Sequence, residues 1–392
     1  MDQSGREIRI SIERIVPGGD GLGRHDGLAV FVPRSAPGDE LVVRVVDVKP
    51  GYCRAEIIEV ASPGPGRVEP LCACYGECGG CNLMHLSYEA QLEAKQGMLR
   101  EAWRRSGGFT GTDDDAVFGA QGIGIEASPP FAYRNRSQFH FDTGHRAGFS
   151  RRSSHTILPL QSCPILVPAL QHWLSVKGAV SGWEEVSPFL KGSDRCIAFG
   201  YGDQVWLDGP DGEVTVEVGG RRFDFHVGGF FQSNLAMLGK LVPVACSGIG
   251  GERAADLYCG VGVFGSFLKD AFQKLVCVER DRRAMGFAGT NIGTDAAYAA
   301  SSVEDWTRTR QAAGHFDYVL MDPPRTGLAA TVRDWLARAK PEVIGYVSCD
   351  PVTAARDAGF LVKAGYSIAA TTIFDFYPQT SNIETYVRFS LD

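Results

Sequence analysis

The carboxyl-terminal part of the chain alternates between apolar runs typical of buried strands and segments of helical character. From Glu252 onward the runs are RAADLY, KLVCVE, FDYVLM and EVIGYV, followed by YSIAATTIF and TYVRFSL. Strands that alternate with helices are typical of a sheet whose crossover helices cover both faces. We therefore predict a doubly wound, mostly parallel α/β sheet of the Rossmann type.

The amino-terminal part has a different rhythm. The runs EIRISIERI, LAVFVP, DELVVRVVDV and YCRAEIIEV are separated by glycine and proline, most densely in PGGDGLGRHDG, which we interpret as a turn. Short strands joined by such turns predict a small β-barrel of the OB-like kind. The linker ASPGPGRVEP marks the first domain boundary. We predict a barrel over residues 1–62, a central α+β domain over 63–225 with a helix near Leu86 to Arg105, and a Rossmann-like domain over 226–392.

Composition limits the classes of function. The 392-residue chain has a formal net charge of −7, which argues against a generally basic RNA-coating protein but not against a local phosphate-binding patch. No signal-peptide core or long apolar run is present, so we expect a cytoplasmic protein with no membrane contact. In that reducing compartment, eleven cysteines favour metal binding or catalysis over disulfides.

Four cysteines lie within ten residues in LCACYGECGGC: Cys72, Cys74, Cys78 and Cys81. Dense thiolates on a glycine-rich loop suit an iron–sulfur cluster or tetrahedral zinc. In one register, C-x5-C-x2-C, the ligands are Cys72, Cys78 and Cys81, with Cys163 in QSCPI as the best placed fourth ligand. In the other, C-x3-C-x2-C, Cys74 replaces Cys72, which is the spacing of radical S-adenosylmethionine enzymes. Gly80, where those enzymes usually have an aromatic residue, and the Rossmann-like half oppose this second register.

The segment DLYCGVGVFG carries the glycine loop of the predicted sheet. Asp256 lies in the preceding strand, and Glu279 ends the next strand, where a carboxylate can accept both ribose hydroxyls of a nucleoside. Asp322, in MDPPR, ends a third strand and faces the same crevice. The pattern resembles the S-adenosylmethionine site of class I methyltransferases. DPPR is also similar to the Asp-Pro-Pro-aromatic loop of amino-methyltransferases, but Arg325 replaces the aromatic residue and disfavours a base amine as the target.

Cys349, in GYVSCDPVTAARD, lies between the strand EVIGYV and an Asp-Pro pair that should begin a helix. A free cysteine is often a small core residue. Ligands, however, bind just beyond the carboxyl ends of strands in α/β sheets. Cys349 is therefore a candidate functional thiol.

Together these motifs resemble the RNA uracil-5-methyltransferase family, and the resemblance covers nearly the whole chain. Residues 1–62 resemble its TRAM domain, an RNA-binding barrel. The first cysteine register with Cys163 resembles the four-iron four-sulfur site of the ribosomal-RNA members. The resemblance implies a class I methyltransferase domain that uses S-adenosylmethionine.

The resemblance also implies a role for particular residues. SCDPVTAARD matches the nucleophile motif, which makes Cys349 the catalytic thiol, and NIETYVRF makes Glu384 the general base. Val263 and the loop PQTSNIE depart from the usual family pattern. The motifs FFQSNL and DLYCGVG, with the two strand-end acids, imply the cofactor-binding residues Gln232, Tyr258, Gly260, Glu279 and Asp322.

The implied chemistry is methylation of uridine C5. A thiolate adds to C6, C5 attacks the methyl group, and a base removes the C5 proton; an ordinary thiol, with a pKa of about 8.5, is a few per cent ionised for this purpose at pH 7. The uridine must be flipped out or single-stranded to be reached. The stretch FAYRNRSQFHFDTGHRAGFSRR interleaves five arginines with aromatic residues, which favours binding of single-stranded RNA.

The resemblance implies 23S ribosomal RNA as the substrate of a monomeric enzyme. Three alternatives stay open: a transfer RNA substrate, a radical S-adenosylmethionine RNA-modifying enzyme, and a non-catalytic RNA-binding iron–sulfur protein. The presence of both Cys349 and Glu384 argues against the last.

Overall fold

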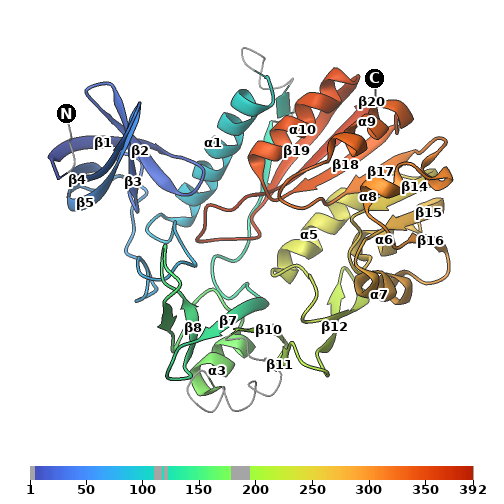
Figure 1. The fold of residues 1–392 in the computed structure, drawn as a ribbon, viewed down its shortest axis with the longest axis horizontal. Helices are drawn as coiled ribbons and strands as arrows, with labels where there is room; N and C mark the ends of the chain where they lie inside the picture. The colour runs from blue at the N-terminus through green and yellow to red at the C-terminus, as the bar shows by residue number, and fades with distance from the viewer. Residues whose placement is uncertain (1–4, 110–116, 119–121, 178–194, 392) are drawn as a thin grey trace.

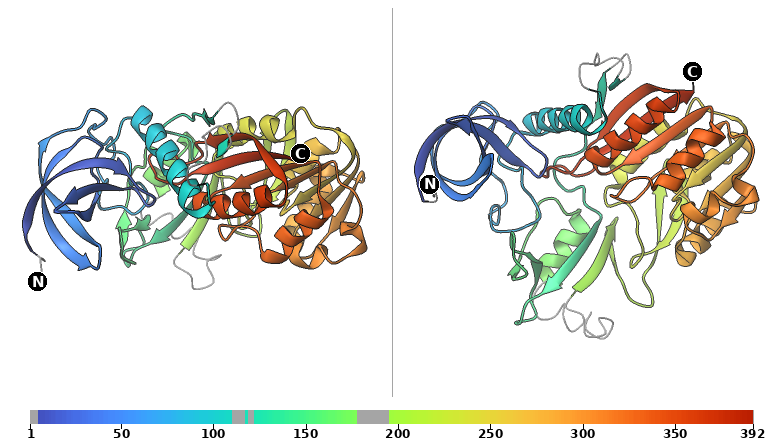
Figure 2. Two further views of the ribbon diagram at one scale, coloured as in Figure 1. Left: turned by 90° about the horizontal axis from the view of Figure 1, so that it is seen from above. Right: turned by 45° about the horizontal axis from the view of Figure 1, so that its top comes forward.

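A computed structural model describes residues 5–109, 117–118, 122–177 and 195–391 of the chain (Figure 1). A small barrel projects from one end of the molecule, and a large α/β region occupies the other end (Figure 2). No helix in these described ranges is long and apolar enough to cross a membrane.

The amino-terminal barrel is closed, with the strand order β1-β2-β3-β5-β4. Alternate residues of β1, such as Ile8 and Ile10, fill its interior. The glycine-rich segment interpreted as a turn instead contains a strand, β2, because its glycines allow close packing: a Cβ at Gly23 would lie 2.5 Å from the Ser11 carbonyl oxygen. The strands are β1 (Glu7–Ile15), β2 (Asp20–His25), β3 (Leu28–Pro33), β4 (Glu40–Lys49) and β5 (Tyr52–Ser62).

The carboxyl-terminal sheet has eight strands in the order β16-β15-β14-β17-β18-β20-β19-β6. The first five are parallel, and β20 runs antiparallel to both of its neighbours. The predicted fold class, a Rossmann-like sheet preceded by a small barrel, is confirmed. Seven of the strands come from the carboxyl-terminal part of the chain: β14 (Gly251–Leu257), β15 (Phe272–Val278), β16 (Ala296–Ala299), β17 (Tyr318–Met321), β18 (Val343–Ser348), β19 (Tyr366–Phe374) and β20 (Glu384–Leu391). The eighth strand, β6 (Ile123–Glu126), comes from an earlier segment.

Helices cover both faces of this sheet and form two hydrophobic cores with it (Figure 1). One face packs against α8 (Val303–Trp306), α9 (Ala330–Ala339) and α10 (Pro351–Lys363). The other packs against α5 (Leu235–Cys246), α6 (Val263–Leu268) and α7 (Arg282–Ile292). A short 3-10 helix, η2 (Arg310–Ala312), precedes β17.

The segment 63–225 is divided between two parts of the structure. Helix α1 (Tyr88–Ser106) packs along α10, and β6 (Ile123–Glu126) pairs in parallel with β19 to form the edge of the large sheet. A separate sheet has the order β11-β10-β7-β8-β9 and carries α3 (Pro168–Lys177). The remaining strands are β7 (Arg136–Phe141), β8 (Ala147–Ser150), β9 (Ile157–Pro159), β10 (Arg195–Tyr201), β11 (Gln204–Leu207) and the hairpin β12 (Glu213–Val218) and β13 (Arg221–His226).

Candidate active site and thiol cluster

The glycine loop between β14 and α6 has a backbone that glycine makes possible. Gly260 and Gly262 have φ values of 54° and 84°, in the left-handed region. A Cβ at Gly262 would lie 2.7 Å from Ile292 Cδ1, so this position also needs glycine for close packing. Beneath the loop, Asp256 Oδ2 accepts a hydrogen bond of 2.8 Å from the Gly265 amide and fixes the start of α6.

Glu279, just beyond β15, braces the same loop. Its carboxylate accepts hydrogen bonds from the amides of Gly260 (3.2 Å) and Asp281 (2.8 Å). Nearby, Gln232 Oε1 and Tyr258 OH are buried and have no hydrogen-bond partner among the described residues. Because an unpaired buried polar atom costs about 1 to 3 kcal/mol, both atoms are available as partners for a polar ligand.

One cavity of about 610 Å³ joins this loop to the ends of β17, β18 and β20. Its size lies within the usual range for small-molecule sites. The structure brings every residue that the motifs predicted for catalysis or cofactor binding to the wall of this cavity: Gln232, Tyr258, Gly260, Glu279, Asp322, Cys349 and Glu384. Val263 also lines it and gives an apolar wall where the family often has asparagine.

The register of two antiparallel strands places Cys349 beside Glu384. Ser348, the last residue of β18, pairs with Thr385 of β20, and the Thr385 hydroxyl donates to the Ser348 carbonyl (3.2 Å). Cys349 directly follows Ser348 and Glu384 directly precedes Thr385, so the same antiparallel register brings these two residues next to each other. Asp350 then caps α10 through the amides of Val352 and Thr353, so the thiol lies at the corner between strand and helix.

The acidic groups of the cavity perturb one another. Burial, together with the charges of Glu384 and Asp322, raises the pKa of the Cys349 thiol to about 11, while Arg325 opposes them. Burial and Asp322 hold the pKa of Glu384 well above its usual range. Burial also raises the pKa of Asp322 to about 7. In the cavity without ligand the Cys349 thiol is therefore less ionised than an ordinary thiol, because the fold buries it and brings two carboxylates near it.

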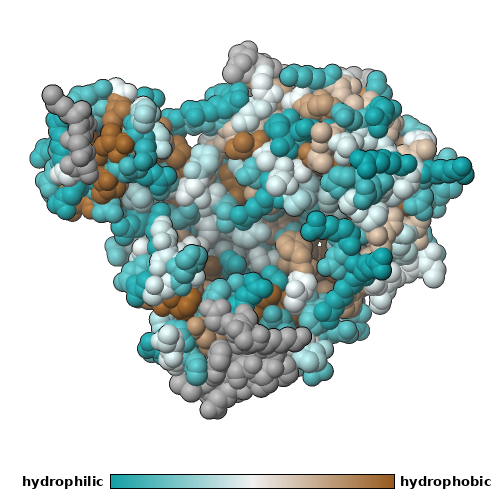
Figure 3. All heavy atoms as spheres, viewed as in Figure 1, coloured by the Kyte–Doolittle hydropathy of each residue, from teal (hydrophilic) through white to brown (hydrophobic). Residues whose placement is uncertain are grey.

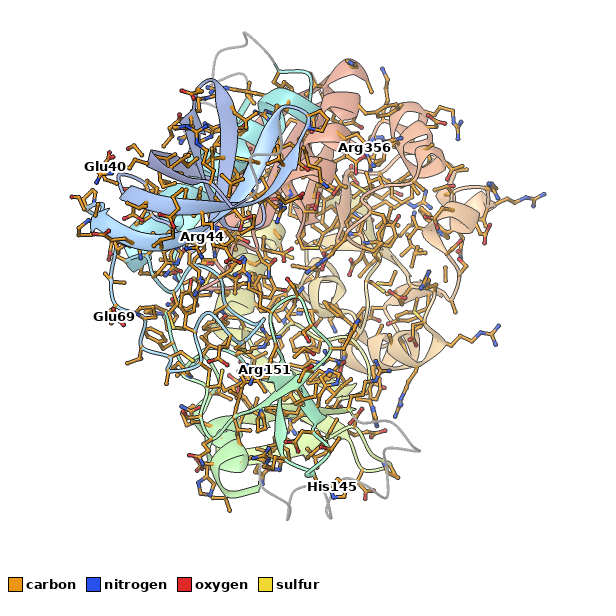
Figure 4. The ribbon with its side chains drawn as sticks, turned by 60° about the vertical axis from the view of Figure 1, so that its left-hand side comes forward. Glu40, Arg44, Glu69, His145, Arg151 and Arg356 are labelled. Carbon is orange, nitrogen blue, oxygen red and sulfur yellow. The ribbon has the colours of Figure 1, made fainter. Side chains whose placement is uncertain are left out.

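The cysteine-rich loop and Cys163 line a second cavity, of about 410 Å³. Two backbone hydrogen bonds hold the loop against the end of β8, from Gly79 to Ser150 (3.0 Å) and from Arg152 to Glu77 (2.8 Å). Arg151, labelled in Figure 4, also pairs with Glu77. All five thiols of this region face the cavity: Cys72, Cys74, Cys78, Cys81 and Cys163.

The spacing of these thiols bears on the kind of metal centre. Burial raises the pKa of Cys81, and the neighbouring charges of Cys163, Cys78 and Cys72 raise it further. In the described part of the chain, the only triads of potential ligand atoms within 4.8 Å of one another lie elsewhere. Tetrahedral zinc would hold thiolates about 3.8 Å apart, given a Zn–S distance of about 2.3 Å. A cluster keeps its thiolates farther apart because an inorganic core separates them. No three of the described thiols in this region are therefore as close together as a bound zinc ion would hold them.

One of the two triads is buried beneath the glycine loop and consists of Asp256, Cys259 and Cys277. The Asp256 carboxylate already accepts the Gly265 amide hydrogen bond, and Cys259 is bonded through its amide to the Val278 carbonyl. This group therefore has a structural role in the loop. The exposed triad is held together by His315, which contacts Asp317 (3.4 Å) and Glu342 (3.2 Å).

The arginines predicted to bind RNA have partners within the protein. Arg134 and Arg136 donate to backbone carbonyls, and the bond from Arg136 to Gly229 (2.9 Å) holds the loop that leads to Gln232. The other three pair with the carboxylates of Asp142, Glu77 and Asp20: Arg146, Arg151 and Arg152. These internal pairs weaken the interpretation of the segment as an RNA-binding surface.

Sequence reasoning missed three other residues of the active-site cavity. Phe230 is 69% exposed, and it lines the cavity together with Arg325 and Tyr377. Phe230 and Arg325 belong to the motifs FFQSNL and DPPR, so their positions next to assigned residues could have indicated them. No local signal marked Tyr377.

Comparisons with known proteins identify the family. The TRAM domain model matches residues 2–58, and the tRNA (uracil-5-)-methyltransferase model matches residues 196–390. An uncharacterized RNA methyltransferase of Treponema denticola is 31% identical over 386 residues, which cover 92% of this chain and 93% of that protein. The chain belongs to the RNA uracil-5-methyltransferase family.

Two further similarities lie within this family. A 23S rRNA (uracil(1939)-C(5))-methyltransferase of Shewanella amazonensis is 29% identical and covers 98% of this chain and 96% of its own. The structure of Pyrococcus abyssi tRNA (uracil-54, C5)-methyltransferase in complex with S-adenosyl-L-homocysteine superimposes with a TM-score of 0.73 at 25% identity, covering 97% and 100% of the two chains. The predicted class I methyltransferase fold and TRAM barrel are confirmed.

Proposed function

We propose that the protein transfers a methyl group from S-adenosylmethionine to C5 of a uridine in 23S ribosomal RNA. The observation that carries the proposal is the single cavity in which a nucleoside-binding loop meets the thiol of Cys349 and the carboxylate of Glu384. Ribosomal RNA is favoured because the 23S rRNA methyltransferase of Shewanella amazonensis is similar over nearly its whole length. The similarity to the Pyrococcus abyssi enzyme makes transfer RNA the second candidate.

In this proposal the cavity residues perform an addition and an elimination. Cys349 adds as a thiolate to uracil C6, and the electron pair of the C5–C6 bond moves to C5 and O4. C5 would then form a bond to the electrophilic methyl carbon of S-adenosylmethionine as the methyl–sulfur bond breaks, and the electron pair of that bond would stay on the sulfur of the departing S-adenosylhomocysteine. Glu384 then accepts the C5 proton, and the electron pair left on C5 re-forms the C5–C6 double bond as the bond from C6 to the Cys349 sulfur breaks.

The charges of the cavity suit this order of events. With a pKa of about 11, the Cys349 thiol is ionised in only about one molecule in ten thousand at pH 7. A sulfonium cation in the cavity favours the ionised forms of Cys349, Asp322 and Glu384, as Arg325 already does for the thiol. Glu384, once ionised, is a stronger base than an ordinary carboxylate because its pKa is raised.

We infer that the second cavity holds a four-iron four-sulfur cluster on Cys72, Cys78, Cys81 and Cys163. The mutual proximity of these four thiols and their all-sulfur donor set support the inference. The cluster would be structural, because the proposed methyl transfer moves no single electron.

The barrel offers a surface for the RNA chain. Tyr52 is 36% exposed and packs edge-on against Phe31, with ring centroids 5.5 Å apart. The exposed arginine Arg54 lies two residues further along the same strand, and apolar surface on the barrel is visible in Figure 3. Aromatic rings next to cations can stack bases and contact phosphates, whatever the net charge of the chain.

Two variants test the proposed roles. Cys349→Ala should bind RNA but lose both turnover and any covalent complex. Glu384→Gln should add, methylate and then stall as a covalent protein–RNA complex that survives denaturing electrophoresis and carries the labelled methyl group. RNA containing 5-fluorouridine should trap the unaltered enzyme in the same way, because fluorine cannot leave as a cation. Ribosomal and transfer RNA fragments tested in parallel decide the substrate.

Cys246→Ala is the matched control, because Cys246 is a partly buried thiol on α5 outside the cavity lining. It should retain turnover and trapping. A Cys349→Ala variant that still forms the adduct, or still methylates RNA, would show that the thiol is only a core residue.

A further inference from the structure

The loop between β19 and β20 leads directly into Glu384 and is almost wholly buried. Asp375, Phe376, Gln379 and Ile383 are all 3% exposed or less. A buried loop must satisfy its backbone polar groups within the protein. The partners that satisfy them show what holds the proposed base in place.

Helix α1 supplies the first set of partners. The Gln379 amide donates to Gln91 Oε1 (2.8 Å), and Gln91 Nε2 donates back to Gln379 Oε1 (3.0 Å). One turn further along α1, Lys95 Nζ donates to the Tyr377 carbonyl (3.0 Å) and to Asp375 Oδ1 (2.5 Å). The loop is therefore joined to one face of α1 through charged and amide groups that are shielded from water.

The residues that directly follow the cysteine-rich loop, Cys72 to Cys81, supply the second set of partners. The amides of Asn82 and Leu83 both donate to the Gln379 carbonyl, at 3.1 and 3.0 Å. The Asn82 side chain accepts from the Ser381 amide (2.8 Å) and donates to the Gly18 carbonyl of the barrel (2.7 Å). Gln379, in the loop between β19 and β20, is thus bonded both to α1 and to the residues that follow the cysteine-rich loop.

The backbone at Gln379 shows that its side chain is needed. Its φ of 69° lies in the left-handed region, where glycine would be less strained. Such a conformation persists in another residue only when its surroundings hold it. Here the reciprocal amide pair with Gln91 does so, together with a bond from Gln379 Nε2 to the Pro130 carbonyl (3.2 Å).

We propose that Gln91 and Gln379 are positioning residues that hold Glu384 for removal of the C5 proton. The inference rests on the function proposed above and adds residues that contact neither RNA nor cofactor. Cys349 has supports that the loop does not provide, namely the end of β18, its pairing with β20 and the Asp350 cap of α10. Loosening the loop therefore displaces the base and leaves the nucleophile in place, so the elimination step slows while the addition step does not.

The test is Gln91→Met, which keeps the length of the side chain and removes both hydrogen bonds to Gln379. RNA with tritium at C5 of the target uridine reports proton removal, and RNA with 5-fluorouridine reports addition and methyl transfer. Tritium release should slow about 10-fold to 100-fold, the range for a misplacement of about 1 Å, while the trap forms at a rate within about twofold of the unaltered enzyme. On ordinary RNA, a methylated covalent complex should accumulate.

The control is Gln96→Met on the same helix. Gln96 donates to the Ile123 carbonyl (3.1 Å) and not to the loop, so tritium release and trapping should both stay unchanged. Should Gln91→Met fail to fold, Gln379→Asn tests the side-chain half of the pair, because asparagine tolerates a positive φ but its side chain is too short to accept from Gln91 Nε2. Equal slowing of trapping and tritium release, or no slowing of either, would overturn the positioning role. Failure of the unaltered enzyme to form the trap would overturn the proposed function instead.

Discussion

The affinity for S-adenosylmethionine should rise with pH, by about tenfold between pH 6 and pH 8. Burial raises the pKa of Asp322 to about 7, so about one tenth of the empty sites are ionised at pH 6 and about nine tenths at pH 8. The sulfonium cation should bind the ionised site, and the tenfold change corresponds to about 1.4 kcal/mol. The Cys349 thiol, with a pKa of about 11, remains largely protonated in the empty cavity over this range.

Calorimetry in two buffers of different protonation enthalpy measures both the affinity and the proton released. Close to one proton should leave per ligand bound at pH 6, and far less than one at pH 8. S-adenosylhomocysteine is the matched ligand, because it has the same amino acid group but a neutral sulfur, and its affinity should change less with pH. Asp322→Asn should abolish the difference between the two ligands.

Two results would refute this reasoning. Parallel changes for both ligands would assign the pH dependence to their shared α-amino group, which titrates at a pKa of about 8. An unaltered difference in Asp322→Asn would assign it to another residue.

Three other changes test the assignments around the two cavities. Glu279→Ala should weaken S-adenosylmethionine binding by about 1 to 3 kcal/mol, the range for a hydrogen bond to a charged group, and calorimetry showing unchanged affinity would remove the ribose assignment. The anaerobically purified protein should absorb near 400 nm, as thiolate-to-iron charge transfer requires. Serine in place of Cys72, Cys78, Cys81 or Cys163 should abolish this absorbance, whereas Cys74→Ser should keep it. Loss of the absorbance in Cys74→Ser, together with its retention in Cys72→Ser, would favour the C-x3-C-x2-C register of radical enzymes. Asp375→Ala should lower the free energy of unfolding by about 3 to 5 kcal/mol, because it leaves the Lys95 charge buried and unpaired, and denaturant titration measures this. Glu252→Ala, which breaks the exposed pair with Lys274, should change it little.

The sequence was most informative where function depends on strand ends. Glu279 and Asp322 directly follow an apolar run, and Cys349 follows one after a single serine. The carboxyl ends of parallel strands meet at one edge of a sheet, so the proximity of these residues could be predicted. Glu384 begins an antiparallel strand, and only the family motif indicated it. Its proximity to Cys349 depends on the β18–β20 register, which the sequence does not state.

Long-range polar contacts were beyond prediction from local pattern. Gln91 and Gln379 are 288 residues apart, and nothing near either residue marks the other. The ion pairs of Arg151 with Glu77 and of Arg152 with Asp20 could not be predicted either, because both carboxylates lie far away in the sequence. The raised pKa of Cys349 likewise depends on the fold, through burial of the thiol and the carboxylates that the fold brings near it.

Strand β6 has a consequence for how this enzyme can be divided. It comes from the segment before residue 127, yet it covers the β19 edge of a sheet whose other strands all begin after residue 250. A fragment cut at the start of the matched methyltransferase region would leave β19 as a bare edge, and unpaired edges recruit other strands and aggregate. The sheet that bears the proposed site therefore cannot be transplanted as the matched region 196–390 alone. Any engineered chimera must also carry residues 88–126, which include both β6 and α1, the helix bonded to the loop that leads into Glu384.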